Sequence, residues 1–252
     1  MPSNLKLTFL GTGEAFDEEL PNTSILCDTG QTRLLMDCGY SIPHQIWKQS
    51  TDPDFLHGIF LSHHHADHAF GLPAVLTRMW ETKRSLPLTI IGHAGTQEYV
   101  HKLMEIGYPT LISRLEFPLE FIDVHAGEQI RFRELELSFA QSIHSVTNYS
   151  IRISYQGKTV CYSGDGSFSE ATKALFKNCD FLIHESFSWE RVVYLHASIR
   201  ELLEMVKEQN IKTYCLIHIQ RDFKKKVWDF LKDFQQEPFK LLVPKPGESV
   251  YL

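Results

Sequence analysis

The sequence predicts an α/β fold, a four-layer αββα sandwich in which two mixed β-sheets pack face to face and are flanked by helices. Three observations lead to this prediction. Segments with strand-like patterns alternate with segments of helical spacing, and the two halves of the chain have similar layouts. The length of 252 residues suits one well-buried domain, which we expect to span residues 1–252.

The first half is predicted to form one sheet with helices outside it. Its opening segment alternates apolar and polar residues and ends at Gly11-Thr12-Gly13, a tight loop. The next two strands are separated by a short polar turn and form a hairpin, whereas residues 58–62 are a short apolar run typical of a buried strand. The predicted strands are 5–10, 23–28, 33–37, 58–62 and 88–92, and the predicted helices are 71–83 and 96–104.

The second half repeats this arrangement with a β-rich stretch first. Helical spacing returns after it and alternates with short apolar strands. The predicted strands are 119–124, 129–139, 150–155, 158–163, 181–184 and 213–217, and the predicted helices are 169–177, 198–209 and 222–234.

Composition bounds the partners and the compartment. The formal net charge is -6, so the protein as a whole does not attract polyanions such as nucleic acids. Five cysteines lie far apart without a C-x-x-C pair, which favours reduced, buried thiols. The sequence begins without a basic region followed by an apolar run and has no stretch of roughly eighteen apolar residues, so we expect a cytoplasmic protein without membrane contact.

Four ligand-type side chains lie within six positions directly after the strand at 58–62. In an extended segment His63 and His65 point the same way, so both can reach one ion while His64 points elsewhere. Where the chain bends into a helix, Asp67 and His68 can turn toward a second ion. The alternative is a solvated or adventitiously chelating histidine tract, which would have to lie at a strand end by chance.

This HxHxDH pattern resembles the metallo-β-lactamase superfamily, whose fold is the sandwich described above. His144, Asp165 and His218, each near the end of a predicted strand, extend the resemblance. Taken singly, His144 or His218 would more often be a structural histidine. The resemblance implies a first ion held by His63, His65 and His144, a second held by Asp67, His68 and His218, and a bridging Asp165.

The implied ligands suit two zinc ions, and manganese is the alternative. Two ions about 3.5–4 Å apart can share one bridging hydroxide and can stabilise both the attacking and the leaving oxygen of a phosphodiester. In the superfamily a carboxylate at position 65 would have indicated its iron-based redox branch, so His65 indicates hydrolysis.

A further resemblance, to ribonuclease Z, the tRNA 3′-end processing endonuclease, covers nearly the whole chain. It implies that Glu185 orients His196, which stabilises charge on the scissile phosphate or protonates the leaving oxygen, and that Asp67 takes up a proton. The alternative is that Glu185 only ends a strand and His196 only caps a helix. The matching motifs are Leu7-Thr8-Phe9-Leu10-Gly11-Thr12-Gly13, Asn22-Thr23-Ser24, Asp37-Cys38-Gly39, Gly71-Leu72-Pro73 and His184-Glu185-Ser186-Phe187.

Three features depart from the ribonuclease Z pattern. Only a short segment, 145–164, lies where that family has a flexible tRNA-binding arm. The loop before Asn22, basic in that family, reads Asp17-Glu18-Glu19-Leu20-Pro21, which would repel phosphates. Gly166 and Ala197 replace the usual threonine and serine. The expected substrate is therefore a small or flexible phosphodiester or an RNA end.

Three other functions stay open from the sequence. The same centre occurs in thioester and lactone hydrolases, from which Glu185 and His196 would distinguish a nuclease-like enzyme. The protein could also be a tRNA 3′-processing endonuclease proper, or a binding protein that has lost turnover. The resemblance to ribonuclease Z implies a homodimer.

Overall fold

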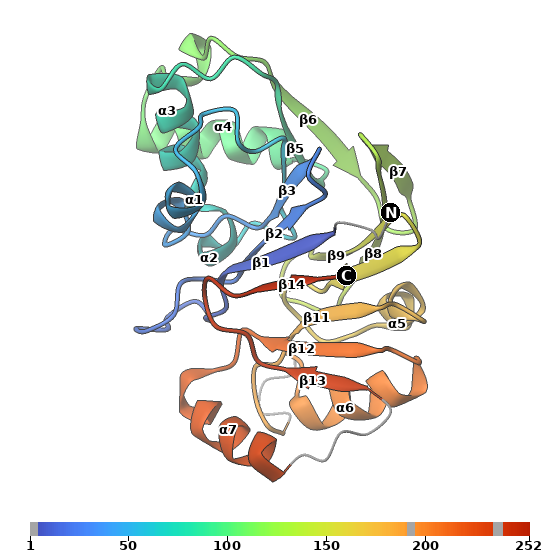
Figure 1. The fold of residues 1–252 in the computed structure, drawn as a ribbon. Helices are drawn as coiled ribbons and strands as arrows, with labels where there is room; N and C mark the ends of the chain where they lie inside the picture. Colours follow the sequence, from blue (N-terminus) through green and yellow to red (C-terminus); the bar gives the residue numbers. More distant parts are fainter. Residues whose placement is uncertain (1–4, 191–194, 234–238) are drawn as a thin grey trace.

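The computed structural model describes residues 5–190, 195–233 and 239–252 and contains two seven-stranded sheets (Figure 1). In the first sheet β1 to β3 pair antiparallel, whereas β3 to β6 run parallel. Its strands, in spatial order, are β14 (Ser249–Tyr251), β1 (Lys6–Gly11), β2 (Ser24–Asp28), β3 (Arg33–Met36), β4 (Gly58–Phe60), β5 (Leu88–His93) and β6 (Leu119–Val124).

The second sheet is also mixed. Its strands β7 to β10 pair antiparallel, and β10 to β13 run parallel. In spatial order they are β13 (Lys240–Leu242), β12 (Thr213–Ile217), β11 (Phe181–Glu185), β10 (Lys158–Tyr162), β9 (Tyr149–Tyr155), β8 (Leu135–Gln141) and β7 (Gln129–Phe132).

Helices cover the outer face of each sheet, which confirms the predicted four layers (Figure 1). Against the first sheet pack α1 (Pro43–Gln49), α2 (Ala66–Ala69), α3 (Leu72–Glu81), α4 (Thr96–Gly107) and the 3-10 helix η1 (Ile112–Arg114). Against the second pack α5 (Glu170–Phe176), α6 (Ile199–Glu208), the 3-10 helix η2 (Arg221–Phe223) and α7 (Lys224–Asp233).

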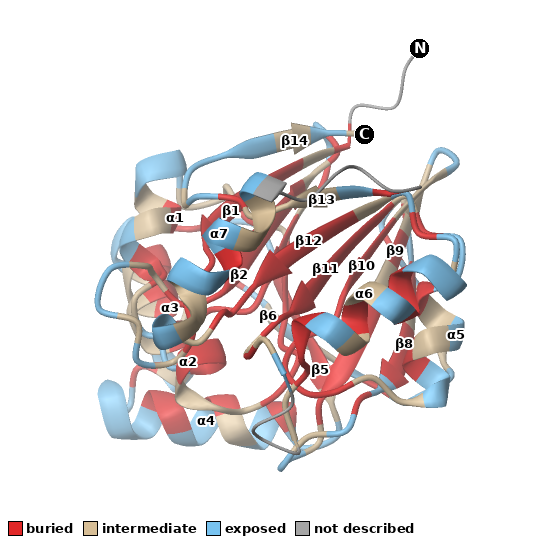
Figure 2. Ribbon diagram, turned by 90° about the horizontal axis from the view of Figure 1, so that it is seen from below, coloured by how far each residue is buried: buried red, intermediate tan, exposed pale blue. Residues whose placement is uncertain are grey.

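The central strands are buried on both faces, because each sheet contacts the other sheet on one side and helices on the other (Figure 2). On β3, Leu34 and Met36 point into the core between the sheets, while Leu35 points toward the helices. On β11, Ile183 points into the core between the sheets and Leu182 points toward the helices. This double burial explains why the central strands are continuous apolar runs in the sequence.

Two predicted elements differ from the structure. The strand expected at 129–139 is a hairpin of β7 and β8, in which Phe132 pairs with Leu135 and Arg133 has a positive φ of 54°. The turn was missed because neither Arg133 nor Glu134 is a typical turn residue. The helix expected from residue 222 begins as η2 and continues as α7, and its predicted end at residue 234 lies outside the described residues.

Five elements were not predicted. They are α1, α2, η1, β13 and β14, and each has seven residues or fewer. The two strands among them depend on long-range contacts, since β14 pairs with β1 and β13 pairs with β12.

All five cysteines are buried and free, as predicted. Among the described residues, no helix has both the length and the apolar character needed to cross a membrane.

Candidate metal centre and active site

The seven predicted metal ligands meet at one edge of the sandwich. His63 and His65 follow β4, Asp165 follows β10 and His218 follows β12. Each of these strands has a parallel neighbour, and the carboxyl ends of parallel strands meet at one edge of a sheet. The two sheets thereby bring together residues that are up to 155 positions apart in the chain, His63 to His218.

The ligand-type atoms form three groups that share residues, and within each group all atoms lie within 4.8 Å of one another. Asp165 lies between the groups, because its carboxylate is 3.2 Å from His68 Nε2, 3.4 Å from His218 Nε2 and 3.9 Å from His63 Nε2. Two of the groups match the predicted ligand sets: one is His63, His65 and His144, and the other is Asp67, His68, Asp165 and His218. The third group consists of His144, Asp165 and His196.

The donor atoms of this cluster fit divalent cations. Within the described part of the chain, His63 Nε2, His68 Nε2 and Asp165 Oδ1 are buried and have no hydrogen-bond partner. Buried polar atoms are rarely left without a partner, so atoms of this kind aimed at a common point indicate a ligand. Imidazole nitrogens and carboxylate oxygens are donors that zinc and manganese accept.

The carboxylates of the cluster favour positive charge between them. Burial opposes protonation of His218, but Asp165 and Asp67 outweigh it and raise the pKa of His218 to about 9. The same two carboxylates, with Asp37, raise the pKa of His68 although it is fully buried. His144 is the opposite case, because burial lowers its pKa to about 4. Cations would replace protons here, so metal affinity should fall as the pH falls.

Asp37 holds His68 in place, a role that the sequence did not reveal. Its Oδ2 accepts hydrogen bonds from His68 Nδ1 at 2.7 Å, from Ser62 Oγ at 2.7 Å and from Tyr162 OH at 2.5 Å. The bond to Nδ1 fixes the tautomer that leaves the Nε2 lone pair for a metal. Asp37 belongs to the Asp37-Cys38-Gly39 motif, and this motif was the feature of the sequence that could have indicated its role.

Gly39 in the same motif allows a close approach of two backbone segments. A Cβ atom at Gly39 would lie 1.9 Å from the Asp67 carbonyl oxygen. Beside it, the Cys38 amide donates to the His68 carbonyl at 2.7 Å. The end of β3 therefore supports the metal-binding turn directly.

Replacing Asp37 with asparagine is expected to weaken metal binding by about 10- to 100-fold. The amide keeps the shape but loses the charge that favours His68 Nδ1–H as donor. Competition between the protein and a zinc-binding dye measures the change. Asp123→Asn, at an exposed carboxylate, is the control. Equal zinc affinity in the wild type and Asp37→Asn would show that Asp37 does not support the site.

Glu185 and His196 lie beside the metal cluster as a hydrogen-bonded pair. Glu185 Oε1 accepts from His196 Nδ1 at 2.8 Å and from the Ala197 amide at 3.0 Å, and Glu185 Oε2 accepts from the Gly166 amide. Burial disfavours the imidazolium of His196, but the hydrogen bond from His196 to Glu185 and the charge of Glu185 outweigh this effect. The pKa of His196 is therefore raised. His196 also stacks on Phe187, with ring centroids 4.5 Å apart.

A cavity of about 490 Å³ opens onto this cluster. Five of the predicted site residues line it: His65, Asp67, Asp165, His196 and His218. Two further lining residues, Ala66 and Phe187, belong to the motifs quoted from the sequence. The remaining lining residues were not predicted, because they come from separate loops and form no motif. They are Glu14, Ala15, Phe16, Tyr40, Gln220 and Arg221.

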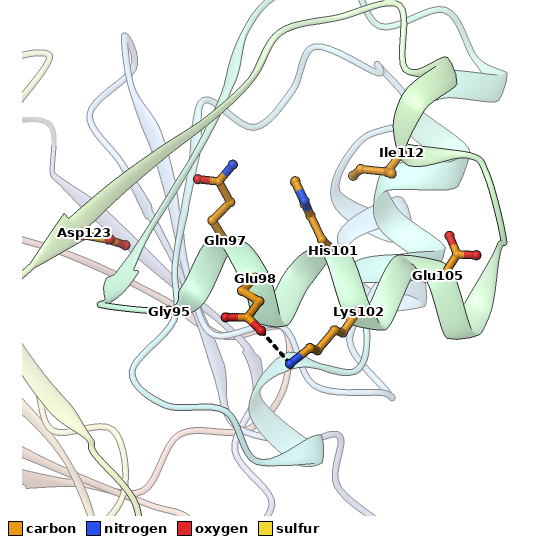
Figure 3. Close-up of a pocket in the computed structure, with 8 residues that line it drawn as sticks. All are labelled: Gly95, Gln97, Glu98, His101, Lys102, Glu105, Ile112 and Asp123. Atoms are coloured by element: carbon orange, nitrogen blue, oxygen red, sulfur yellow. Dashed lines mark ion pairs between the residues drawn. The ribbon is translucent and has the colours of Figure 1, made fainter.

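A larger hollow of about 620 Å³ lies on the outer face of α4 (Figure 3). Most of its lining side chains project from α4, and Glu98 and Lys102 form an ion pair there at 2.7 Å. None of its lining residues is a predicted site residue. We therefore assign the candidate active site to the smaller cavity.

The comparisons with known proteins agree with this geometry. The ribonuclease Z of Methanosarcina acetivorans is 24% identical over 284 aligned residues, which cover 91% of this chain and 92% of that protein. The ribonuclease Z of Enterococcus faecalis is 25% identical over 295 residues, covering 93% of each. The predicted relationship to ribonuclease Z is confirmed.

Solved structures share the fold. The metallo-β-lactamase fold protein YhfI from Bacillus subtilis aligns with a TM-score of 0.80 at 22% identity, covering 98% of this chain and 99% of that protein. The short form of human tRNase Z gives 0.77 at 18% identity, with coverages of 97% and 98%. Zn(2+)-bound PqqB from Methylobacterium extorquens gives 0.75 at 14% identity, with coverages of 98% and 100%.

A protein family described as Anti-Pycsar protein Apyc1 matches residues 5–236, which is most of the chain. This match was not anticipated from the sequence motifs discussed above. The chain therefore belongs to the Anti-Pycsar protein Apyc1 family, and it is a metal-dependent hydrolase with the metallo-β-lactamase fold.

Proposed function

We propose that the protein is a dinuclear-metal phosphodiesterase that hydrolyses small phosphodiesters. The observation that carries this proposal is the Glu185 and His196 pair beside two groups of metal-ligand atoms in one cavity. A histidine held by a buried carboxylate can supply a proton to an alkoxide leaving group. Hydrolysis of an activated carboxyl ester has less need for such a donor.

In this proposal each residue has a separate task. His63, His65 and His144 would hold one cation, Asp67, His68 and His218 would hold the other, and Asp165 lies where it could serve both. Two divalent cations would supply a nucleophile at neutral pH and neutralise charge on the phosphate. His196 protonates the leaving oxygen, Glu185 keeps His196 protonated and oriented, and Asp67 accepts a proton from the attacking water.

We propose zinc as the metal, with manganese as the alternative. Five imidazoles and two carboxylates form a ligand set that zinc favours. The structural relative PqqB was solved with Zn(2+) bound. Metal analysis of protein purified without chelators tests the assignment, and two equivalents of zinc per chain are expected.

A small substrate is favoured over folded tRNA. Between His144 and Asp165 the chain forms only the hairpin β9 and β10, which pairs within the sheet. The segment is therefore part of the core and offers no projecting arm to grip an RNA. The cavity of about 490 Å³ is within the range of pockets that hold small molecules.

We also propose that the single domain acts in the cytoplasm as a homodimer. Five buried, unpaired thiols suit a reducing compartment. The homodimer is carried over from the resemblance to ribonuclease Z, and light scattering tests it directly.

The decisive experiment offers the metal-replete enzyme several substrates. These are bis(p-nitrophenyl) phosphate, a thioester, a lactone and a tRNA precursor, each given also to Asp67→Ala. We expect phosphodiester turnover that is lost in Asp67→Ala and little cleavage of the precursor. Turnover of the thioester or lactone alone would contradict the proposal and leave Glu185 and His196 as structural residues. No turnover of any substrate with two bound metals would favour a binding protein.

A further inference from the structure

Glu14, Ala15 and Phe16 lie at the rim of the active-site cavity, and we call residues 14–20, the segment to which they belong, the rim loop. Two cations, Arg221 and Lys224, fix this loop to the segment that follows His218, and Lys224 pairs with both Asp17 and Glu19. Arg221 Nη1 donates to Glu14 Oε1, and Lys224 Nζ lies 2.7 Å from Asp17 Oδ2. The partners are 207 residues apart in the sequence in both cases.

These contacts change the interpretation of the acidic loop. The side chains of Glu14 and Asp17 are 3% and 0% exposed, and each is paired with a cation. Two negative charges of the loop are therefore neutralised and buried instead of facing a phosphate. On the opposite side, Tyr40 OH donates to the Ala15 carbonyl, so the loop is fixed at both flanks.

We propose that Arg221, held by Glu14, forms with Phe16 a specificity site that binds an uncharged hydrogen-bond acceptor on a planar substituent of the substrate. This inference rests on the proposed phosphodiesterase function and concerns the part of the substrate that is not the phosphate.

The charges of the cavity support an uncharged acceptor. Among the lining residues in the described chain, Arg221 is the single Lys or Arg. Glu14 uses both oxygens, because Oε2 accepts from the Phe16 amide at 2.8 Å while Oε1 accepts from Arg221. Arg221 carries five N–H groups, and its side chain is 39% exposed, so donors remain for a ligand. Since Glu14 neutralises the pair, a neutral acceptor suits it better than a second phosphate.

The aromatic residues of the cavity support a planar substituent. Phe16 is 77% exposed and Tyr40 is 49% exposed, although both line the cavity. Phe187 contributes a third ring, next to His196. Exposed aromatic faces at a cavity mouth bind flat rings by stacking. A ring placed there would cover Phe16 from solvent.

The specificity site is close enough to the metal centre for one substrate to contact both. Arg221 lies three residues after His218, so their Cα atoms are at most about 11 Å apart. The Gln220 amide donates to the Phe187 carbonyl at 2.9 Å, and the Phe187 ring stacks on His196. The segment that contains Arg221 is thereby held next to His196. A substituent on a phosphate held at the metal centre can therefore reach the Arg221 side chain.

Two substrates with the same leaving group test the inference. Thymidine 5′-(p-nitrophenyl) phosphate carries a planar ring with carbonyl acceptors, and methyl p-nitrophenyl phosphate carries none on its second substituent. We expect the wild type to prefer the thymidine ester in kcat/KM. Arg221→Gln should reduce the ratio of the two kcat/KM values by tenfold or more, mainly through KM. Arg221→Lys should restore only part of the ratio, because an ammonium lacks the planar fork of the guanidinium.

Lys224→Gln is the matched control, since it removes the other ion pairs of the rim loop, those with Asp17 and Glu19, without changing a residue that lines the cavity. Its ratio should equal that of the wild type. A ratio that falls equally in Lys224→Gln would assign the effect to loop placement and overturn the inference. A wild type without preference, or Arg221→Gln and Arg221→Lys ratios equal to that of the wild type, would also overturn it. Failure to cleave either ester would instead refute the proposed phosphodiesterase function.

Discussion

Replacing Asp165 with asparagine is expected to lower kcat/KM for bis(p-nitrophenyl) phosphate by about three orders of magnitude or more. The carboxylate lies 3.2 Å from His68, 3.4 Å from His218 and 3.9 Å from His63, so it serves both groups of metal ligands. Asparagine keeps the volume but removes the charge that a bridging ligand needs. Both cations should therefore bind less tightly, and their charges should no longer act on one phosphate.

Steady-state kinetics and metal analysis of the same samples check this prediction. The expected result is a loss of activity together with a loss of bound metal. Asp123→Asn controls for the removal of a carboxylate, because Asp123 is exposed at the hollow on α4. Activity within about tenfold of the wild type, with both metals retained, would show that Asp165 is not a shared ligand.

The second large effect is expected for the pair formed by Glu185 and His196. His196→Ala and Glu185→Gln should each lower kcat by about 10²- to 10⁴-fold, the usual contribution of a positioned general acid. Metal content should stay unchanged, because the proposal assigns both cations to the other two groups and gives His196 and Glu185 a role in proton transfer. The double variant should be little worse than His196→Ala, since Glu185 acts through His196.

The pH profile separates this role from a structural one. His196 donates a proton only below its own pKa, so kcat should fall as the pH rises through that value. Glu185 raises this pKa, so Glu185→Gln should move the alkaline limb of kcat to lower pH. In His196→Ala the limb should disappear. A substrate with a better leaving group should be less affected, and an unchanged alkaline limb in both variants would refute the assignment.

The sequence predicted the architecture well in those segments where the local pattern of apolar and polar residues follows from the position of the segment in the fold. The alternation in β1 and the apolar runs of β4 and β12 arise because each residue faces a defined layer. The turn at Arg133 and Glu134 was missed because its residues carry no turn signal. The short strand β14 was missed because pairing with β1, more than 240 positions away, holds it.

The candidate metal ligands could be predicted from the sequence because few residue types bind metal. Histidine and aspartate at strand ends have few alternative explanations when His63, His65, Asp67 and His68 lie within six positions. His144 and His218 needed the resemblance to a family, since a single histidine carries no pattern. The structure then brought all of these donors to one edge of the sandwich.

The sequence by itself determined the two-sheet fold and the residues able to hold metal. Only the tertiary structure decided what surrounds them: the support of His68 by Asp37, the neutralisation of Glu14 by Arg221, and the cavity that these residues share with the metal centre. The physical reason is the range of the interactions. Periodicity and ligand spacing are properties of short segments, whereas a pair joined across 207 residues forms only when the two sheets pack and bring their loops to a common edge.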